Sequence, residues 1–477
     1  MIAGLKPYPA MKDSGVPWLG DVPEHWEVRK LRNLLNPITA RNRPGLPLLS
    51  VVREKGVIQR DTTSKDENRN FIPDDLSNYK VVRAGQFAMN KMKAWQGSYG
   101  VSQYNGIVSP AYFVFDTYGV EGAFFHAAIR SQTYVPFFAQ ASDGVRISQW
   151  DLSQARMKEI PFSVPPPPEQ AAIVLFLDRA DRRILRYIRA KQKLIKLLEE
   201  QKQAIINRAV TRGLDPNVHL KPSSVEWLGK VPVHWEVFRL KFVAARIVDC
   251  LHATPQYSDA GQFPAIRTAD IAPGVVRLES VRRIGVEEYD RWTQRLKPAE
   301  DDILYSREGE RFGIAACVPK GVQLCISQRM MVFSIRREHN STFVMWQVNS
   351  PQVYAQASQD VMGATAPHVN VSTIRNYALV LPTRSEQDAI VAQIEASTGD
   401  SARAIATACQ EISLLREYRT RLIADVVTGK LDVREASTRL PDEAREPESS
   451  DDVEAVEHAE ELIDAGEPGD DNVEVET

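Results

Sequence analysis

The sequence predicts an α+β fold in which two repeated α/β modules are separated by two long antiparallel coiled-coil helices, with a disordered acidic C-terminal tail. Three observations support this prediction. A tryptophan-rich motif occurs twice, each copy is followed by a long segment with heptad spacing, and the final residues are strongly acidic. A chain of 477 residues also exceeds one compact core, because domains usually hold about 100–200 residues.

The tryptophan-rich motif opens each module. Residues 14–31 read SGVPWLGDVPEHWEVRKL and residues 223–240 read SSVEWLGKVPVHWEVFRL, in register throughout. We interpret the tryptophans of this motif as core anchors. Neither His25 nor His234 has a carboxylate or a cysteine at metal-ligand spacing, so we interpret both histidines as structural rather than catalytic residues.

The two modules are predicted to span residues 1–168 and 214–385. Each contains short runs rich in β-branched and aromatic residues, which are typical of strands. A stretch with helical character follows these runs, at residues 122–140 in the first module and 341–358 in the second. The order of the runs is the same in both modules while their sequences have diverged, so we expect related α+β folds with different targets.

A long helix is predicted after each module, at residues 169–213 and 386–433. Both start with Glu-Gln, and a glycine stop signal lies at Gly213 and at Gly429. Apolar residues alternate at spacings of four and three, which predicts a coiled-coil seam, although Gly399 interrupts the second copy. The expected seam residues are Ile184, Ile188, Ile195, Leu198, Ile205, Ile405, Ile412, Leu415 and Leu422.

One such helix cannot bury its seam alone. At 1.5 Å per residue it is roughly 65 Å long, which exceeds the width of a single module. The two helices are therefore expected to pair with each other in antiparallel orientation. The alternative is that each helix packs only on its own module.

The loop after the second β-like run of each module is rich in side chains that suit nucleic acids. Arg and Lys bind phosphates and guanine edges, and Gln binds adenine edges. The alternative is an ordinary solvated loop with a packed aromatic residue. The candidate DNA-binding residues are Lys91, Lys93, Trp95, Gln96, Ser98 and Tyr99 in the first module, and Arg267, Ser306, Arg307 and Arg311 in the second.

Charge is distributed unevenly along the chain. Residues 441–477 contain 16 Asp and Glu and one Arg, a net charge of −15, with few large apolar residues. This composition predicts an acidic disordered tail, which we assign to residues 434–477. Residues 1–440 contain 58 Lys and Arg and 46 Asp and Glu, a net charge of +12. This excess is compatible with an anionic partner and also with a merely soluble surface.

Motifs of several enzyme classes are absent from the sequence. It contains no P-loop, no Rossmann glycine fingerprint, no zinc-protease motif and no EF-hand loop. The four cysteines lack the spacing of a disulfide framework or a zinc ribbon, so no metal site is expected. No apolar segment has the length of a membrane span or the form of a signal peptide, which favours a cytoplasmic location. We therefore predict a non-catalytic binding protein.

The repeated motifs resemble those of a known family. The order WLG-x-VP-x-HWEV, proline followed by Glu-Gln, and a helix that ends in TRGLD or TGKLD is similar to that of the specificity (S) subunit of type I restriction–modification systems. The resemblance covers about residues 8–435 and leaves the acidic tail outside.

The resemblance implies a function for each part of the chain. The modules would be target recognition domains, each of which reads one half of a split double-stranded DNA target. The seam-bearing helices would act as the spacer and as the docking surface for two methyltransferase (modification) subunits. Those partners would carry S-adenosylmethionine for adenine-N6 methylation, and restriction (motor–nuclease) subunits would add ATP and Mg²⁺, so no cofactor is expected in this chain. The alternative is a coiled-coil scaffold or partner-binding protein with the same fold but no DNA readout.

Overall fold

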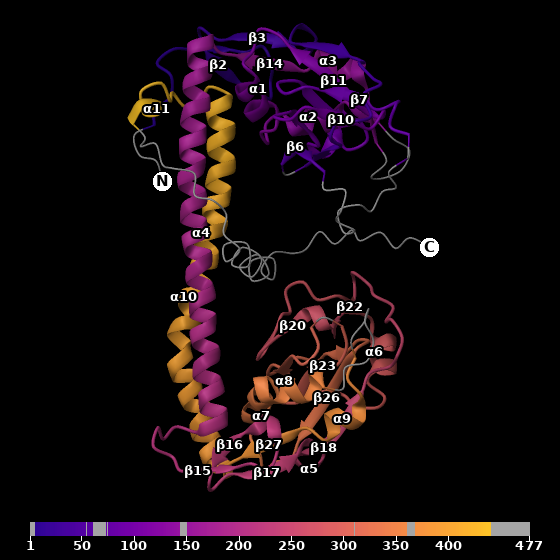
Figure 1. Cartoon of the computed structure of the whole chain (residues 1–477), viewed down its shortest axis with the longest axis vertical. Coiled ribbons are helices and arrows are strands. Elements are labelled where there is room, and N and C mark those ends of the chain that lie inside the picture. The colour runs from indigo at the N-terminus through magenta and orange to yellow at the C-terminus, as the bar shows by residue number, and fades with distance from the viewer. Residues whose placement is uncertain are drawn as a thin grey trace. The chain divides into compact units, whose positions relative to one another are not determined.

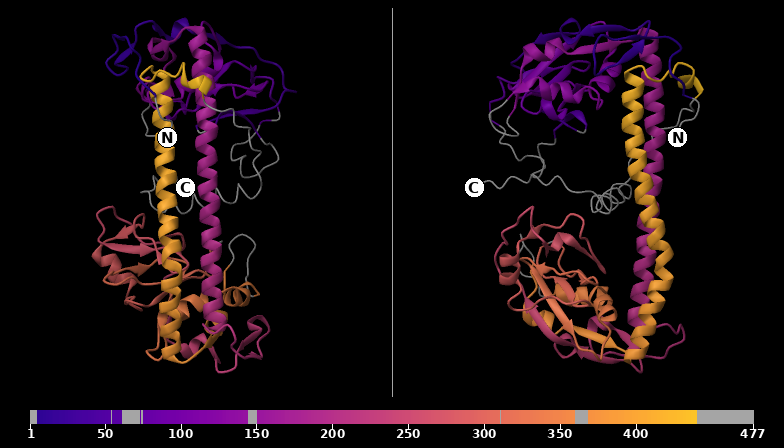
Figure 2. Two further views of the ribbon diagram at one scale, coloured as in Figure 1. Left: turned by 90° about the vertical axis from the view of Figure 1, so that its left-hand side faces the viewer. Right: turned by 180° about the vertical axis from the view of Figure 1, so that it is seen from behind.

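The computed structural model describes residues 5–439, except residue 54, residues 61–72, residue 74, residues 144–149, residue 310 and residues 360–367. The described residues form two compact units (Figures 1 and 2). The first unit runs to Ile188 and resumes at Ile412, and the second comprises Arg189–Glu411. Each unit therefore combines one module with parts of both long helices, and the helices are not domains of their own.

The first unit is built around a four-stranded antiparallel sheet in the order β4-β11-β8-β9. Its module contains β1 (Met11–Asp13), β2 (Asp21–Pro23), β3 (Glu27–Lys30), η1 (Leu31–Asn33), β4 (Leu35–Ile38), β5 (Leu49–Val52), β6 (Gly56–Gln59), β7 (Lys80–Val82), β8 (Phe87–Asn90), η2 (Ala94–Gln96), β9 (Tyr99–Val101), β10 (Gly106–Val108), β11 (Tyr112–Thr117), α1 (Gly122–Ile129), α2 (Val135–Gln140), β12 (Ser142–Asp143), β13 (Asp151–Leu152), α3 (Gln154–Glu159) and β14 (Pro161–Val164).

The second unit repeats this sheet in the order β18-β26-β23-β24. Its module contains β15 (Leu220–Pro222), η3 (Glu226–Leu228), β16 (Lys230–Pro232), β17 (Glu236–Arg239), α5 (Leu240–Val243), β18 (Ala244–Asp249), β19 (Phe263–Ile266), η4 (Thr268–Asp270), β20 (Ile271–Ala272), β21 (Val275–Val276), β22 (Arg283–Ile284), α6 (Val286–Trp292), β23 (Ile303–Ser306), β24 (Ala315–Cys317), β25 (Cys325–Ile326), β26 (Met330–Ile335), α7 (Ser341–Val348), α8 (Pro351–Ser358), α9 (Val371–Arg375) and β27 (Ala378–Leu381). The α+β prediction is confirmed in both units.

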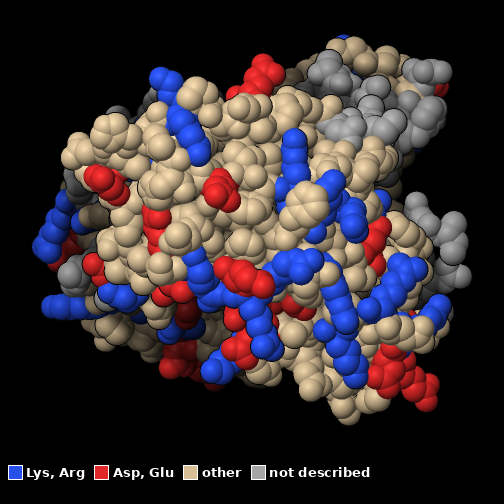
Figure 3. Space-filling model, turned by 90° about the horizontal axis from the view of Figure 1, so that it is seen from below, with Lys and Arg blue, Asp and Glu red and all other residues tan. Residues whose placement is uncertain are grey.

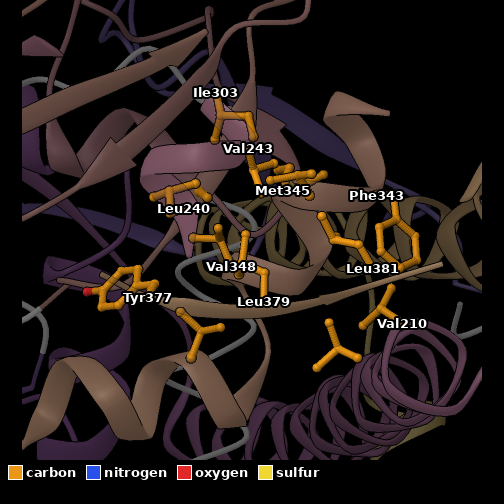
Figure 4. Packing of buried hydrophobic residues seen from close by; sticks show 14 of the residues in the cluster. Val210, Leu240, Val243, Ile303, Phe343, Met345, Val348, Tyr377, Leu379 and Leu381 are labelled. Atoms are coloured by element: carbon orange, nitrogen blue, oxygen red, sulfur yellow. The ribbon is translucent and has the colours of Figure 1, made fainter. Parts of the chain in front are cut away.

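Each predicted helical stretch is two short helices. The first stretch divides into α1 and α2, and the second into α7 and α8. The side chain of Glu121 caps α1 and that of Asn340 caps α7, so equivalent helices start with equivalent polar caps. α7 packs its apolar side chains into the core of the second unit, where Phe343, Met345 and Val348 are buried (Figure 4).

The two long helices are α4 (Pro167–Arg212) and α10 (Arg384–Val427). They lie side by side in Figures 1 and 2 and run antiparallel, as predicted. In the first unit Arg419 pairs with Asp181, and in the second Lys191 pairs with Glu411 at 2.6 Å. The predicted seam residues Ile184, Ile188, Ile195, Ile405, Ile412 and Leu422 are buried, and Leu198, Ile205 and Leu415 are partly buried.

α10 differs from its prediction at both ends. It begins at Arg384, continues through Gly399, and ends at Val427 rather than residue 433. Gly429 adopts a left-handed backbone with φ of 77°, and the Lys430 N–H donates to the Asp425 carbonyl at 2.8 Å, which closes the helix.

The predicted tail boundary at residue 434 is also wrong. Residues 436–439 form α11 (Ala436–Arg439), and the Ser437 carbonyl accepts a hydrogen bond from Arg179 Nη1 at 2.8 Å. Residues 440–477 of the predicted tail lie outside the described residues.

The repeated histidine-tryptophan and Glu-Gln motifs meet in each unit. In the first unit, Trp26 Nε1 donates to Glu169 Oε1 at 2.9 Å and His25 Nε2 lies 2.7 Å from Glu169 Oε2. In the second unit, Trp235 Nε1 donates to Glu386 Oε1 at 3.0 Å, and His234 Nε2 lies 3.0 Å from Glu386 Oε2. The buried tryptophans anchor the start of each long helix to its module, so the motif is structural.

The glutamine of each Glu-Gln pair forms a second link. Gln170 Nε2 donates to the Pro165 carbonyl at 2.8 Å, while its Oε1 accepts the Glu121 N–H at 2.6 Å. In the second unit, Gln387 makes the same two contacts, to the Pro382 carbonyl and the Asn340 N–H, at 2.9 and 2.8 Å. Each glutamine therefore joins the start of a long helix to the start of α1 or α7.

The interhelical ion pair between Asp181 and Arg419 is expected to contribute little to stability. Both side chains are substantially exposed, and such pairs are usually worth about 0.2–1 kcal/mol. A double-mutant cycle with Asp181→Asn and Arg419→Gln, followed by urea unfolding, measures their coupling energy. A coupling energy well above about 1 kcal/mol would contradict this expectation. The same cycle on the Lys191–Glu411 pair is the control in the second unit.

Candidate nucleic-acid interface

Two loops occupy the same place in the two modules. Residues 91–98 connect β8 to β9, and residues 307–314 connect β23 to β24. Each loop has eight residues and passes through a left-handed glycine at its seventh position, Gly97 with φ of 93° and Gly313 with φ of 89°. The two loops are therefore structural equivalents that carry different side chains.

The start of each loop is held by a later segment of its module. The Leu152 N–H donates to the Lys91 carbonyl at 3.0 Å, and the Val369 N–H donates to the Arg307 carbonyl at 3.2 Å. A methyl group added at Gly97 would contact Val135 of α2, and one at Gly313 would overlap the ring of Tyr354 of α8. These contacts fix the path of both loops.

In the first loop, four candidate residues lie at least partly on the surface. The side chain of Lys93 is exposed and makes no hydrogen bond or ion pair with the described residues. Lys91 is 34% exposed and its Nζ lies 2.9 Å from Asp151 Oδ2. The Trp95 ring lies 5.3 Å from the ring of Trp150, and its Nε1 has no hydrogen-bond partner within the described part of the chain. Gln96 is partly buried.

Two other candidates of the first loop belong to the core. Ser98 is buried, and Tyr99 is the first residue of β9, packed between Phe87 and Phe138. Burial raises the pKa of the Tyr99 hydroxyl well above its usual value. These side chains therefore support the loop from the core and offer no surface for a DNA contact.

The cationic candidates of the second module are engaged with acceptors of the same module. Arg307 is only 11% exposed and pairs with Asp249 and with Glu308, the latter at 2.8 Å. Arg267 Nη2 lies 3.0 Å from Asp270 Oδ1. Arg311 Nη2 donates to the Ile271 carbonyl at 3.0 Å, and Ser306 is fully buried at the end of β23. A DNA contact by Arg307 or Arg267 therefore requires exchange of an internal ion pair.

The aromatic residue of the second loop has a stacked partner. The Phe312 ring lies 5.1 Å from the ring of Tyr354, nearly parallel to it, and Tyr354 is exposed. The sequence does not single out Tyr354 as a candidate, because it lies on a helix far from the loop along the chain. On the face shown in Figure 3, basic and acidic side chains are interspersed, in agreement with the paired charges of the second module.

The described residues offer no alternative site with recognisable chemistry. Among them, no group of His, Cys, Asp and Glu could hold a metal ion. A hollow of about 440 Å³ in the first unit is lined by His126, Arg130, Asp181 and Arg419, among others. Burial, followed by the charge of Arg130, lowers the pKa of His126 to about 4. Asp181 and Arg419 are paired with each other there, and the residues that line this hollow belong to neither loop, although Arg130 donates to the Gly97 carbonyl of the first loop at 3.5 Å.

No helix in the described part of the chain combines the length and apolarity needed to cross a bilayer.

Comparisons with known proteins show which class of protein this chain resembles. Residues 232–402 match the family described as the type I restriction modification DNA specificity domain. The chain is 21% identical over 243 residues to the specificity subunit of the type I restriction enzyme MjaX of Methanocaldococcus jannaschii. It is 20% identical over 281 residues to the MjaVIII specificity subunit of the same organism. The matched regions cover 46% and 58% of this chain, and 53% and 63% of these relatives.

A solved structure shares the fold over most of the chain. One chain, from work on complex assembly and conformational transition of the type I R-M system, has a TM-score of 0.56 and 15% identity, and the match covers 86% of this chain and 99% of that chain. The HsdS subunit from Thermoanaerobacter tengcongensis has a TM-score of 0.42 and 16% identity, with coverage of 86% and 98%. The predicted resemblance to the specificity subunits of type I restriction–modification systems is thereby confirmed.

Proposed function

We propose that this chain recognises a specific DNA sequence on behalf of a type I restriction–modification complex and performs no catalytic step itself. Each module reads one half of a bipartite target. The loops 91–98 and 307–314, with the residues around them, provide the contacts to bases and phosphates. Partner subunits then methylate adenine at N6 and cleave DNA.

One observation carries this proposal. The two modules share the sheet order, the loop length and the left-handed glycine, while the other loop side chains differ. A common scaffold with diverged loops is what two recognition domains with different target sequences require, since base contacts specify sequence and the scaffold positions them. A scaffold without DNA readout gives no reason for this divergence.

The proposed partners rest on the resemblance to type I specificity subunits. Two methyltransferase subunits would dock on α4 and α10 and would carry S-adenosylmethionine, and restriction subunits would bring ATP and Mg²⁺. Exposed leucines on these helices, Leu194 and Leu197 on α4 and Leu414 on α10, supply apolar surface for such docking.

Exchange of residues 46–165 for the equivalent segment of another specificity subunit tests this proposal. The methylated sequence is expected to change in one half only, because the second module remains intact. Methylome sequencing of a host that carries the hybrid chain and its partner subunits provides the readout. A change in both halves, or in neither, would contradict the assignment of one half-site to each module. Loss of all methylation with intact complex assembly would contradict independent folding of the modules.

A further inference from the structure

Three cations of the first module converge at the ends of its strands. Arg41 and Lys80 are backbone neighbours in a β-bridge, next to a hydrogen bond from the Val81 N–H to the Ala40 carbonyl. Lys80 Nζ donates to the Tyr112 carbonyl at 2.5 Å. Tyr112 stands opposite Asn90 in the β11–β8 pair, and Lys91 directly follows Asn90.

Aromatic side chains form part of this cluster. Lys80 Nζ lies 5.6 Å from the centre of the Phe113 ring, and Asn90 Nδ2 donates to the Tyr112 hydroxyl at 3.4 Å. Residues that are widely separated in the sequence, at positions 41, 80, 91 and 112, thus surround one spot beside the first loop. No pattern in the sequence indicates this cluster, because its members come from separate segments of the chain.

The cluster has more positive than negative charge. Among the contacts that Arg41, Lys80 and Lys91 make with described residues, the one carboxylate is that of Asp151, which pairs with Lys91. The Arg41 side chain is exposed and has no hydrogen-bond or ion-pair partner in the same part of the chain. Burial lowers the pKa of Lys80, and the charges of Arg41 and Lys91 lower it further. A bound anion would relieve this repulsion.

The corresponding positions of the second module are apolar. Ile38 pairs with Val114 in the first module, and Val248 pairs with the equivalent residue Val332 in the second, so Ile38 and Val248 correspond. Arg41 lies three residues after Ile38, and the residue three positions after Val248 is Leu251. Gly85 and Asp301, which both have a left-handed backbone, also correspond. Lys80 lies five residues before Gly85 and Leu296 lies five residues before Asp301, so Leu296 takes the position of Lys80.

These replacements change the surface of the second module. Leu251 and Leu296 each pack against a hydrophobic cluster of that module, and buried Met330 stands at the position of Tyr112. The third cation has an equivalent in Arg307, which is paired with Asp249 and Glu308.

We propose that Arg41, Lys80 and Lys91 form a phosphate-binding site on the first module, and that this module supplies the larger share of the salt-dependent affinity for DNA. This inference rests on the proposed function, since the phosphates are those of the DNA backbone. The second module then contributes to specificity more than to electrostatic attraction, because its equivalent cation is already neutralised.

The salt dependence of DNA binding tests this site. The full chain, alone or with its partner subunits, is titrated against a fluorescein-labelled duplex of arbitrary sequence over a series of salt concentrations. Each lost phosphate contact lowers the slope of log K against log[salt] by about 0.9. Arg41→Gln and Lys80→Gln are each expected to lower the slope by this amount. When the salt concentration rises fourfold, the affinity of the wild type for the duplex should therefore fall by a factor about 3.5 times larger than the affinity of each variant does.

Lys320→Gln is the matched control. Lys320 is an exposed lysine of the second module without a partner among the described residues, and its removal changes the net charge equally. A slope change at Lys320 equal to that at Arg41 would overturn the proposed site, because net charge alone would then explain the effect. Arg41→Gln removes no side-chain contact within the described residues, so it remains informative even if Lys80→Gln destabilises the fold.

Two further outcomes separate the site from the function. Salt-dependent binding by the wild type with unchanged slopes in the Arg41 and Lys80 variants would overturn the site and leave the DNA-binding function intact. No duplex binding at low salt would overturn both. A competition arm with inorganic phosphate at constant ionic strength distinguishes the ligand source: selective displacement of the duplex by millimolar phosphate would assign the cluster to a free phosphate instead of the DNA backbone.

Discussion

Glu169→Ala is expected to lower the free energy of unfolding of the first unit by about 3 kcal/mol or more. The carboxylate of Glu169 is only 6% exposed and accepts hydrogen bonds from Trp26 Nε1 and the Tyr8 hydroxyl, both on buried side chains. Removal of a buried acceptor costs about 1–3 kcal/mol for each donor left unsatisfied. Burial and the bond to Glu169 raise the pKa of Tyr8 above its usual value, so this hydroxyl remains a donor at neutral pH.

The second unit supplies the matched variant. Glu386 is 30% exposed and accepts from Trp235 and from the exposed His234, and Glu386→Ala is therefore expected to cost about 1–2 kcal/mol. Hydrogen exchange of peptides from each unit, measured with increasing urea, shows in which unit the free energy of unfolding has decreased. If Glu169→Ala and Glu386→Ala lowered the free energy of unfolding equally, burial of the glutamate would not determine the size of the destabilisation. Glu169→Gln retains one acceptor oxygen and should lose less than Glu169→Ala.

The sequence predicts the histidine-tryptophan motif and the Glu-Gln pair, but it does not predict that the two motifs are in contact. The histidine-tryptophan motif and the Glu-Gln pair are each recognisable as repeats, yet 143 residues separate Trp26 from Glu169. Periodicity and propensity describe neighbours along the chain, whereas this hydrogen bond depends on how β3 pairs with β14 just before α4 begins. The long helices are predictable for the opposite reason, because their heptad pattern is local.

The sequence predicts where the candidate interface lies, but not which of its side chains are buried or paired with acidic residues. Tyr99 and Ser306 lie at the first and last residues of strands, where the strand directs them into the core. Lys91 and Arg307 both follow a central strand, yet only the structure shows that Asp249 and Glu308 surround Arg307. The cluster around Lys80 is not predictable, because residues drawn from separate segments of the chain have no signature in a single sequence.

Gly429→Ala is expected to lower the free energy of unfolding of the first unit by about 2–4 kcal/mol. Gly429 adopts φ of 77°, and left-handed backbone costs an alanine about 1 kcal/mol. The added methyl group would also lie 2.7 Å from Pro23 Cγ and 3.1 Å from the Trp26 ring. Overlap with such rigid groups in a packed region typically adds about 1–3 kcal/mol. The glycine that ends α10 thus permits close approach to the motif that opens the first module.

Two other glycines separate the backbone effect from the steric effect. Gly20 has φ of 65° and open space where an added methyl group would lie, so Gly20→Ala should cost only the backbone term, about 1 kcal/mol. Gly213, which ends α4 with φ of 75°, would place its methyl group 3.3 Å from the Trp235 ring, a milder overlap. The expected order of destabilisation is Gly429, then Gly213, then Gly20, measured by urea unfolding of the three variants. If Gly20→Ala and Gly429→Ala were equally destabilising, contact with Pro23 and Trp26 would play no part, and the end of α10 would not need glycine for packing.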